Sequence, residues 1–250
     1  VRFDGEDVAI VVADTEDHAE DAVRLAKLEV ERGRAVVDVE SAEAPGAPIV
    51  NARATGNVYR SGRGPSPAES DERLAKAEEA MRGSGVTVLE RTYRTQVQTH
   101  SALEPHGAVV RPDEDGGVTV WCSSQGTSAV RDGIAGAVKL AGSKVRAIVE
   151  HVGGGFGGKL AYSPVGSGLC NEVARAAMQL MRPVRGGADR REEHACGGNR
   201  PSSIQTVRLA VKKDGEVVAY TARIRGTAGA SESGAGAANP MIYELGRTAK

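Results

Sequence analysis

The chain contains little of several features that mark common classes of protein. Only 3% of its 250 residues are aromatic, which is low for a self-sufficient core and suggests that packing partners lie elsewhere. No apolar run approaches the roughly 20 residues that a membrane-spanning helix needs. A formal net charge of −1, without a long basic run, gives no electrostatic case for binding nucleic acid or anionic lipid. These absences leave a soluble globular protein as the expected class.

Cysteine is also scarce, and its spacing excludes two kinds of site. The three residues Cys122, Cys170 and Cys196 lie far apart and form no C-x-x-C pair. A zinc or iron–sulfur site within this chain is therefore not expected. The odd number argues against a disulfide framework and favours a reducing compartment. We expect a cytoplasmic location, with the periplasm as the alternative.

Glycine, by contrast, is abundant, and its densest run follows a predicted strand. Residues 144–152 carry the β-forming residues of that strand, and residues 153–159 read GGGFGGK. Each glycine costs conformational entropy. Five glycines around a single Phe156 therefore indicate a loop whose backbone N–H groups approach a ligand closely.

Three known types of glycine-rich loop could account for this segment. A phosphate-binding P-loop requires Ser or Thr after its lysine, but Leu160 stands there. A dinucleotide fingerprint fits the glycine spacing, with Glu172 at a suitable distance for a ribose, but needs a helix directly after Gly158. Pro164 and the glycines near it disfavour that helix. A purely structural loop is the third possibility.

The pattern divides the chain near residue 88, and the first part predicts a small α/β domain. We expect strands at 6–13 and 35–39, joined by a helix that Asp14 or Thr15 caps and that ends near residue 32. A second helix is expected from a capping box at Ser66 to about Arg82.

The second part predicts further strands and helices. Strands are expected at 86–93, at 106–111 with 117–123 as a hairpin, and at 204–211 with 217–224 as a hairpin turned at 213–215. Helices are expected from residue 127 or 128 to about 141 and over 169–181. Residues 226–240 read as an irregular connector. Gly186 and Gly187 occupy an expected strand, which they would weaken.

Several motifs taken together resemble one enzyme family. GGGFGGK at residues 153–159 resembles the signature of the xanthine dehydrogenase and aldehyde oxidase family, in its molybdenum-cofactor subunit. Other stretches match in the same order: residues 1–9 (VRFDGEDVA), 95–106 (TQVQTHSALEPH), 121–127 (WCSSQGT), 182–184 (RPV), 189–194 (DRREEH) and 198–201 (GNRP). The resemblance covers nearly the whole chain, and the ordered set is more specific than any one motif.

The resemblance implies a fold and a chain that is part of something longer. It implies an α/β (α+β) chain, with the end of a hammerhead-type domain at residues 1–88 and the first part of a molybdopterin-binding domain at residues 89–250. Molybdenum subunits of the family are several times longer, and no segment here matches their catalytic glutamate. We therefore expect one part of a larger enzyme.

The resemblance also implies the chemistry and the partners. The family oxidises an aldehyde or N-heterocycle by inserting a water-derived oxygen at a carbon next to a heteroatom. Its cofactor is molybdenum with molybdopterin or with the dinucleotide form of that pterin. Electrons pass to Fe–S and FAD groups on partner domains or subunits. The expected partners are the rest of the molybdenum subunit, an Fe–S subunit, a FAD subunit and a small-molecule substrate.

By the same resemblance, Gln125 and Phe156 are the candidate catalytic residues. Gln125 falls where the family places an amide donor to a molybdenum oxygen, and Phe156 where a phenylalanine shapes the substrate channel. Arg200 lies near the substrate side and could polarise a carbonyl. The cofactor-binding positions are Gln125, Gly154, Gly155, Phe156 and Gly157. Leu160 replaces a glutamate of the purine-oxidising members, which favours an aldehyde or another apolar-edged substrate.

Four other polar features carry weaker expectations. Lys159 is as readily a solvent-facing lysine as a ligand-facing one. His100 and Glu104 could lie on one helical face, as a structural pair rather than a metal site. His106 is expected to be structural, and residues 189–193 to form a solvated turn. A cofactor-free scaffold subunit is the non-enzyme alternative to the hydroxylase.

Overall fold

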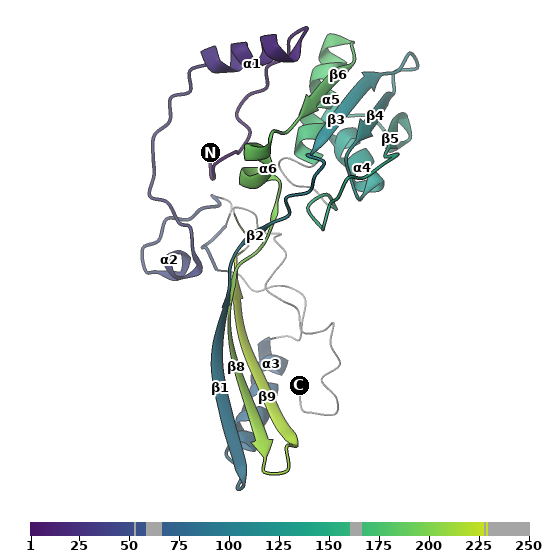
Figure 1. Cartoon of the computed structure of the whole chain (residues 1–250). Helices are drawn as coiled ribbons and strands as arrows, with labels where there is room; N and C mark the ends of the chain where they lie inside the picture. The colour runs from purple at the N-terminus through teal and green to yellow at the C-terminus, as the bar shows by residue number, and fades with distance from the viewer. Residues whose placement is uncertain (53, 59–66, 161–166, 228, 230–250) are drawn as a thin grey trace. The chain divides into compact units, whose positions relative to one another are not determined.

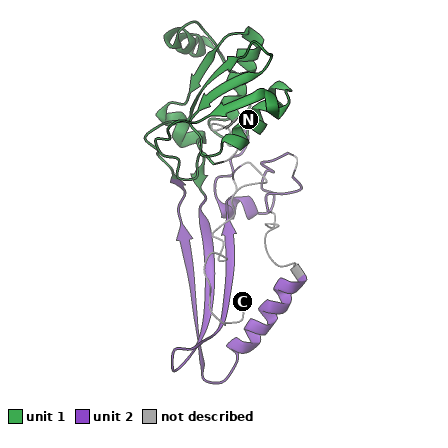
Figure 2. Cartoon of the chain, turned by 90° about the vertical axis from the view of Figure 1, so that its right-hand side faces the viewer, with its two compact units in different colours: residues 1–32, 99–200 green, residues 33–98, 201–250 purple. Residues whose placement is uncertain are grey.

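The computed structural model describes residues 1–52, 54–58, 67–160, 167–227 and 229. Its contacts divide the chain into two compact units, residues 1–32 with 99–200 and residues 33–98 with 201–250 (Figure 2). Segments on both sides of residue 88 therefore belong to the second unit. The assignment of residues 1–88 and 89–250 to two family domains stays a prediction.

The first unit is built on a four-stranded sheet with the order β5-β4-β3-β6 (Figure 1). The hairpin of β3 (Gly107–Pro112) and β4 (Val118–Cys122) is antiparallel, as the sequence predicts. Strand β5 (Val145–Ile148) runs parallel to β4, and β6 (Val184–Gly187) runs antiparallel to β3. The predicted strand at 144–152 is thus shorter, so that the chain leaves the sheet before the glycine run.

Two helices cover this sheet and close its core. Helix α4 (Thr127–Val138) packs against β5, and α5 (Ser167–Leu180) packs against β3, β6 and α4. Both helices fall where apolar periodicity predicts them. The largest side chains that are fully buried are β-branched: Val110, Val118, Val120, Ile134 and Val173. A short 3₁₀ helix, η1 (Gly142–Lys144), leads from α4 into β5.

The two glycines of β6 have a packing reason. A Cβ atom on Gly186 would lie 2.6 Å from Val173 Cγ2 in α5. Only glycine therefore lets the helix approach the sheet this closely. The strand that the glycines were expected to weaken forms nevertheless, because Gly186 pairs with Ala108 of β3.

The N-terminal part differs most from the prediction. Residues 6–13 and 35–39 form no strand, and the helix between them, α1 (Glu16–Leu25), ends earlier than residue 32. Thr15 caps it as predicted, but none of its residues is buried. A strand needs a neighbour for its N–H and C=O groups, and the described residues place none beside either segment. Helix α2 (Val39–Glu43) instead begins with a capping box at Asp38.

The second unit is a three-stranded antiparallel sheet with the order β1-β8-β9. Its strands β1 (Val86–Thr95), β8 (Ser203–Lys212) and β9 (Val217–Gly226) confirm three predicted strands. Gly215 allows the β8–β9 turn with a φ of 91°. Helix α3 (Pro67–Met81) packs Ala77 and Met81 against the sheet. Ser66 and most of the connector predicted at 226–240 lie outside the described residues.

Three short elements complete the fold. Strand β2 (Gln98–Thr99) pairs with β7 (Asn199–Arg200). Helix α6 (Arg190–Cys196) lies where a solvated turn is predicted, and Asp189 begins it with a capping box to Glu192. A mixed charge run can thus be a short capped helix, which its composition alone does not reveal. None of the described helices is both long and apolar enough to cross a membrane.

Candidate functional site

The glycine loop, residues 153–159, follows β5 and has an unusual backbone. Gly154 and Gly157 have φ values of 98° and 93°, which are accessible to glycine at little cost. Phe156 has a φ of 50°, a conformation that costs a non-glycine residue about 1–3 kcal/mol and that gathers at functional sites. The loop therefore keeps the Phe156 backbone in a conformation that non-glycine residues normally avoid.

Gln125, predicted from the sequence, lies directly against this loop. Its Oε1 accepts hydrogen bonds from the N–H groups of Gly157 (3.0 Å) and Lys159 (3.3 Å). A Cβ atom on Gly155 would lie 2.3 Å from the same oxygen. Gly155 is thus a close-approach position, but the group that approaches is a protein side chain. The Gln125 amide nitrogen has no acceptor within the described part of the chain, so it can donate to a ligand.

Backbone donors of the loop also face no described partner. The N–H groups of Gly154, Gly155 and Phe156 make no hydrogen bond to an acceptor in the described residues. Successive N–H groups around a residue in the left-handed conformation form a cradle for anions and oxygen ligands. The loop and the Gln125 amide nitrogen therefore fit a cofactor that presents oxygen atoms.

The two ends of the loop are held together by Glu104. Its carboxylate accepts the Gly153 N–H at 2.6 Å and the Lys159 ammonium at 3.2 Å. Lys159 also donates to the Glu104 carbonyl oxygen at 2.7 Å, and its side chain is only 1% exposed. Lys159 is therefore not a solvent-facing lysine. The sequence alone could not show whether the Lys159 side chain is exposed or buried, because its burial depends on Glu104, which lies far away along the chain.

The predicted pairing of His100 with Glu104 is wrong, because residues 100–104 are not helical. Glu104 instead serves the loop. His100 lies against Gly158, where a Cβ atom would come within 2.9 Å of its Nδ1. That nitrogen is buried and has no hydrogen-bond partner in the described structure. No group of three or more potential metal ligands occurs among the described residues.

Glu104 gives a testable dependence on pH. Burial raises its pKa, but the hydrogen bonds from Gly153 and Lys159 and the charge of Lys159 hold the pKa below its ordinary value of 4.5. The unfolded chain therefore binds the proton more readily, and Glu104 stabilises the fold above pH 4.5. This contribution is lost as the pH falls through the lower folded value.

We expect Glu104→Gln to be less stable than the native chain from pH 5 to 8, with the difference shrinking below pH 4.5. Urea unfolding at a series of pH values measures this difference. Glu150→Gln is the control, because Glu150 makes no ion pair among the described residues. A difference that persists unchanged down to pH 3 would contradict the assignment.

Phe156 and Arg200, two other residues predicted for the site, are both exposed. The Phe156 side chain is 74% exposed, so it is not a core residue, and its ring lies over Gly154. Arg200 is exposed on β7, and no hydrogen bond or ion pair links it to the loop within the described residues. His106 is buried, as expected of a structural histidine. The structure therefore brings Gln125 to the loop, but leaves the substrate role of Arg200 a prediction.

The three cysteines are shielded from solvent to different degrees. All three are free; Cys170 and Cys196 are buried and Cys122 is partly buried. Burial raises the pKa of the Cys196 thiol to about 11, which keeps it a protonated, unreactive thiol.

The loop is not that of a dinucleotide-binding fold. Lys159 and Leu160 are not helical, and the helix after them, α5, begins at Ser167. The sheet of the first unit has only one parallel strand pair among the described strands. A doubly wound parallel sheet, which that fold requires, is absent from the described residues.

Known proteins of three kinds resemble the chain. Indole-3-acetaldehyde oxidase of Arabidopsis thaliana is 30% identical over 91% of this chain and 16% of its own length. Xanthine dehydrogenase of Emericella nidulans is 28% identical over 98% of this chain and 18% of its own length. The crystal structure of quinoline 2-oxidoreductase from Pseudomonas putida 86 superposes with a TM-score of 0.69 and 28% identity, over 85% of this chain and 25% of that one.

The chain thus spans less than a fifth of the length of these two curated relatives. The family described as "Molybdopterin cofactor-binding domain" matches residues 63–246, which include β1, the glycine loop and both sheets. The mixed α/β fold, the sequence relatives and this match agree. The chain therefore belongs to the molybdopterin cofactor-binding family of the xanthine dehydrogenases and aldehyde oxidases.

Proposed function

We propose that this chain forms part of a molybdenum hydroxylase and contributes one wall of its cofactor site. The observation that carries the proposal is the glycine loop with its unengaged N–H groups from Gly154 to Phe156 beside the Gln125 amide nitrogen. Such fixed donors suit a group with oxygen ligands, because they need no rearrangement when it binds.

Each residue has a separate task in this proposal. Gln125 keeps Oε1 on the loop and turns its Nε2–H group toward the cofactor, as a neutral donor that adds no titrating charge. The N–H groups of residues 154–156 provide further donors, while exposed Phe156 limits access to the substrate side. Molybdenum with molybdopterin supplies, when bound, the oxygen-insertion and electron-accepting chemistry.

We further propose an aldehyde or an N-heterocycle as the substrate. Leu160 is 55% exposed next to the loop and offers an apolar edge rather than a charge. The relatives act on an indole aldehyde, xanthine and quinoline by their names, so similarity alone favours no single substrate. Fe–S and FAD groups on partner domains or subunits would accept the electrons, and a cytoplasmic location is proposed.

The first experiment is elemental mass spectrometry for molybdenum on natively purified protein with all co-purifying chains. We expect near-stoichiometric molybdenum together with a larger or additional polypeptide. No molybdenum in an intact, folded assembly would overturn the proposal and favour a cofactor-free scaffold.

Two substitutions at Gln125 separate its tasks. Gln125→Glu keeps an acceptor for the Gly157 and Lys159 N–H groups but removes the amide donor, whereas Gln125→Ala removes both. We expect Gln125→Glu to retain the loop but lower kcat by about tenfold or more, because a donor to the reacting centre becomes an acceptor. Gln125→Ala should in addition reduce the molybdenum content. Equal kcat in the native and Gln125→Glu proteins would exclude the donor role.

A further inference from the structure

A buried acid–imidazole pair lies next to the glycine loop and has no task in the function proposed above. The side chains of Glu193 and His106 are 6% and 4% exposed. Glu193 Oε1 accepts the His106 Nδ1–H group at 2.7 Å and also the His106 backbone N–H. A buried carboxylate is unfavourable unless it is paired and hydrogen-bonded. The question is what this pair holds in place.

His106 connects the pair to the loop. Its Nε2 lies 3.3 Å from the carbonyl oxygen of Gly158. A carboxylate and a carbonyl are both acceptors, so both ring nitrogens must donate at the same time. The Glu193 carboxylate is thus the partner of Nδ1, and the Gly158 carbonyl is the partner of Nε2.

Gly158 in turn fixes the shape of the loop. Its N–H group donates to the Gly155 carbonyl oxygen at 2.8 Å and closes the turn that contains Phe156 and Gly157. Both residues of this turn have positive φ values. The contact from His106 to the Gly158 carbonyl therefore keeps this strained turn from relaxing to another backbone conformation. The N–H groups of residues 154–156, which precede Gly158, then keep their direction.

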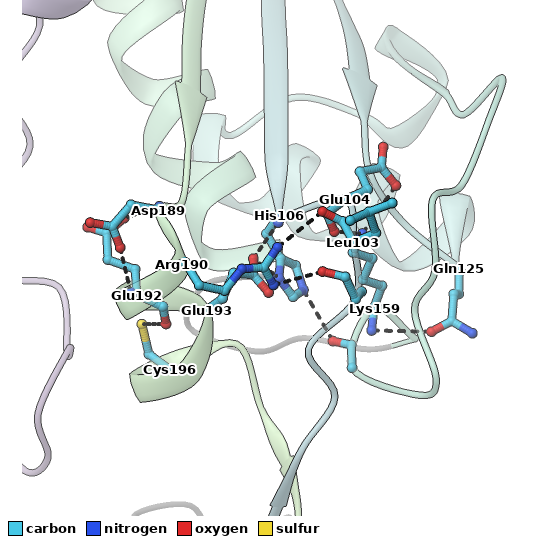
Figure 3. Close-up of polar contacts among 12 residues, drawn as sticks. Leu103, Glu104, His106, Gln125, Lys159, Asp189, Arg190, Glu192, Glu193 and Cys196 are labelled. Atoms are coloured by element: carbon cyan, nitrogen blue, oxygen red, sulfur yellow. Dashed lines mark hydrogen bonds and ion pairs between the residues drawn. The ribbon is translucent and has the colours of Figure 1, made fainter.

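Helix α6 holds Glu193 from the other side. Arg190 donates to the carbonyl oxygens of Ala102 (2.7 Å) and Leu103 (3.1 Å). Gly197 leaves room for the acid, because a Cβ atom there would lie 2.5 Å from the Glu193 carbonyl oxygen and 3.2 Å from Oε2. Figure 3 shows Arg190 and Glu193 reaching from α6 toward the segment that carries Leu103 and His106.

We propose that Glu193 is a positioning residue: it fixes the His106 ring through Nδ1, and His106 holds the glycine loop through the Gly158 carbonyl. The identity of the ligand that the loop receives rests on the function proposed above, but the ordering of the loop does not. Other ionisable groups occur on the segments around the pair. They are Glu104 and Lys159, which bind each other, His100 beside Gly158, Glu192, which caps α6, and His194, which contacts Ser101.

The test measures hydrogen-exchange protection of loop amides in the natively purified protein with its co-purifying chains, from pH 5.5 to 8. In the native protein the Gly157 and Gly158 amides should stay protected throughout. Glu193→Gln can still accept from His106 but carries no charge. The His106 Nδ1–H group then loses its charged acceptor, so protection of both amides should fall by about tenfold or more.

Glu192→Gln is the matched control, since Glu192 lies on the same helix and its carboxylate accepts a hydrogen bond from the Asp189 N–H group rather than from His106. It should leave the protection of the loop unchanged. The same loss in both variants would reduce Glu193 to a structural residue and overturn the proposal. Unchanged protection in Glu193→Gln would overturn it as well.

If Glu193→Gln does not fold, Glu193→Asp replaces it. The shorter acid keeps the charge, so the loop should loosen equally at pH 5.5 and pH 8; full protection would overturn the proposal. Molybdenum is measured on the same samples. A native protein without molybdenum but with the expected exchange pattern would refute the proposed function alone, and a molybdenum-loaded protein with an unresponsive loop would refute this inference alone.

Discussion

Replacing Gly155 by alanine should remove the molybdenum while leaving the fold nearly intact. The new Cβ atom would lie 2.3 Å from Oε1 and 2.7 Å from Cγ of Gln125, so the glutamine side chain must move away. It then loses both hydrogen bonds to the loop. Because Gln125 is exposed and its side chain can rotate into solvent, we expect a stability loss within about 1 kcal/mol.

The expected fall in molybdenum content of the Gly155→Ala protein is at least about tenfold, since a donor and its support are lost together. Elemental mass spectrometry and chemical unfolding on one preparation measure the two effects. Gly136→Ala is the control, because Gly136 has open space in α4 and alanine should stabilise the helix by about 0.5–1 kcal/mol. Full molybdenum in the Gly155→Ala protein would show that the loop is not the cofactor cradle.

The second large effect concerns stability rather than the site. Gly186→Ala should destabilise the first unit by about 1–3 kcal/mol, the usual cost of overpacking a core. Its Cβ atom would lie 2.6 Å from Cγ2 of Val173, a fully buried side chain that cannot move into solvent. Denaturant unfolding followed by circular dichroism measures this loss.

The adjacent Gly187 provides the control for this prediction. A Cβ atom there would find only the His106 carbonyl oxygen within 4 Å, at 3.9 Å, so Gly187→Ala should change stability by less than about 0.5 kcal/mol. Val173→Ala should partly rescue Gly186→Ala, with a coupling energy of about 1 kcal/mol or more. Equal stability losses for Gly186→Ala and Gly187→Ala would contradict the prediction, as would strictly additive losses for Gly186→Ala and Val173→Ala. Either result would assign the loss to strand propensity rather than to the contact with Val173.

The local sequence pattern correctly predicted the helices and hairpins whose stabilising interactions lie within one short segment. The 3.6-residue spacing of α4 and α5, and the hairpin turns at 113–116 and 213–215, are properties of short segments, and the structure confirms them. The strands expected at 6–13 and 35–39 failed for the opposite reason. Their apolar residues predict burial, but a strand also needs a partner ladder, which a local pattern does not specify.

The sequence by itself determined the family, through motifs in a fixed order, and it determined that residues 153–158 must approach something closely. Only the tertiary structure decided what the glycines approach: Glu104 at Gly153, Gln125 at Gly155 and His100 at Gly158. It also buried Lys159, which the sequence left undecided, and Glu193, which the sequence placed in a solvated turn. Their partners are about 55 and 87 residues away along the chain, and a buried charge is tolerated only where folding brings such a partner into contact.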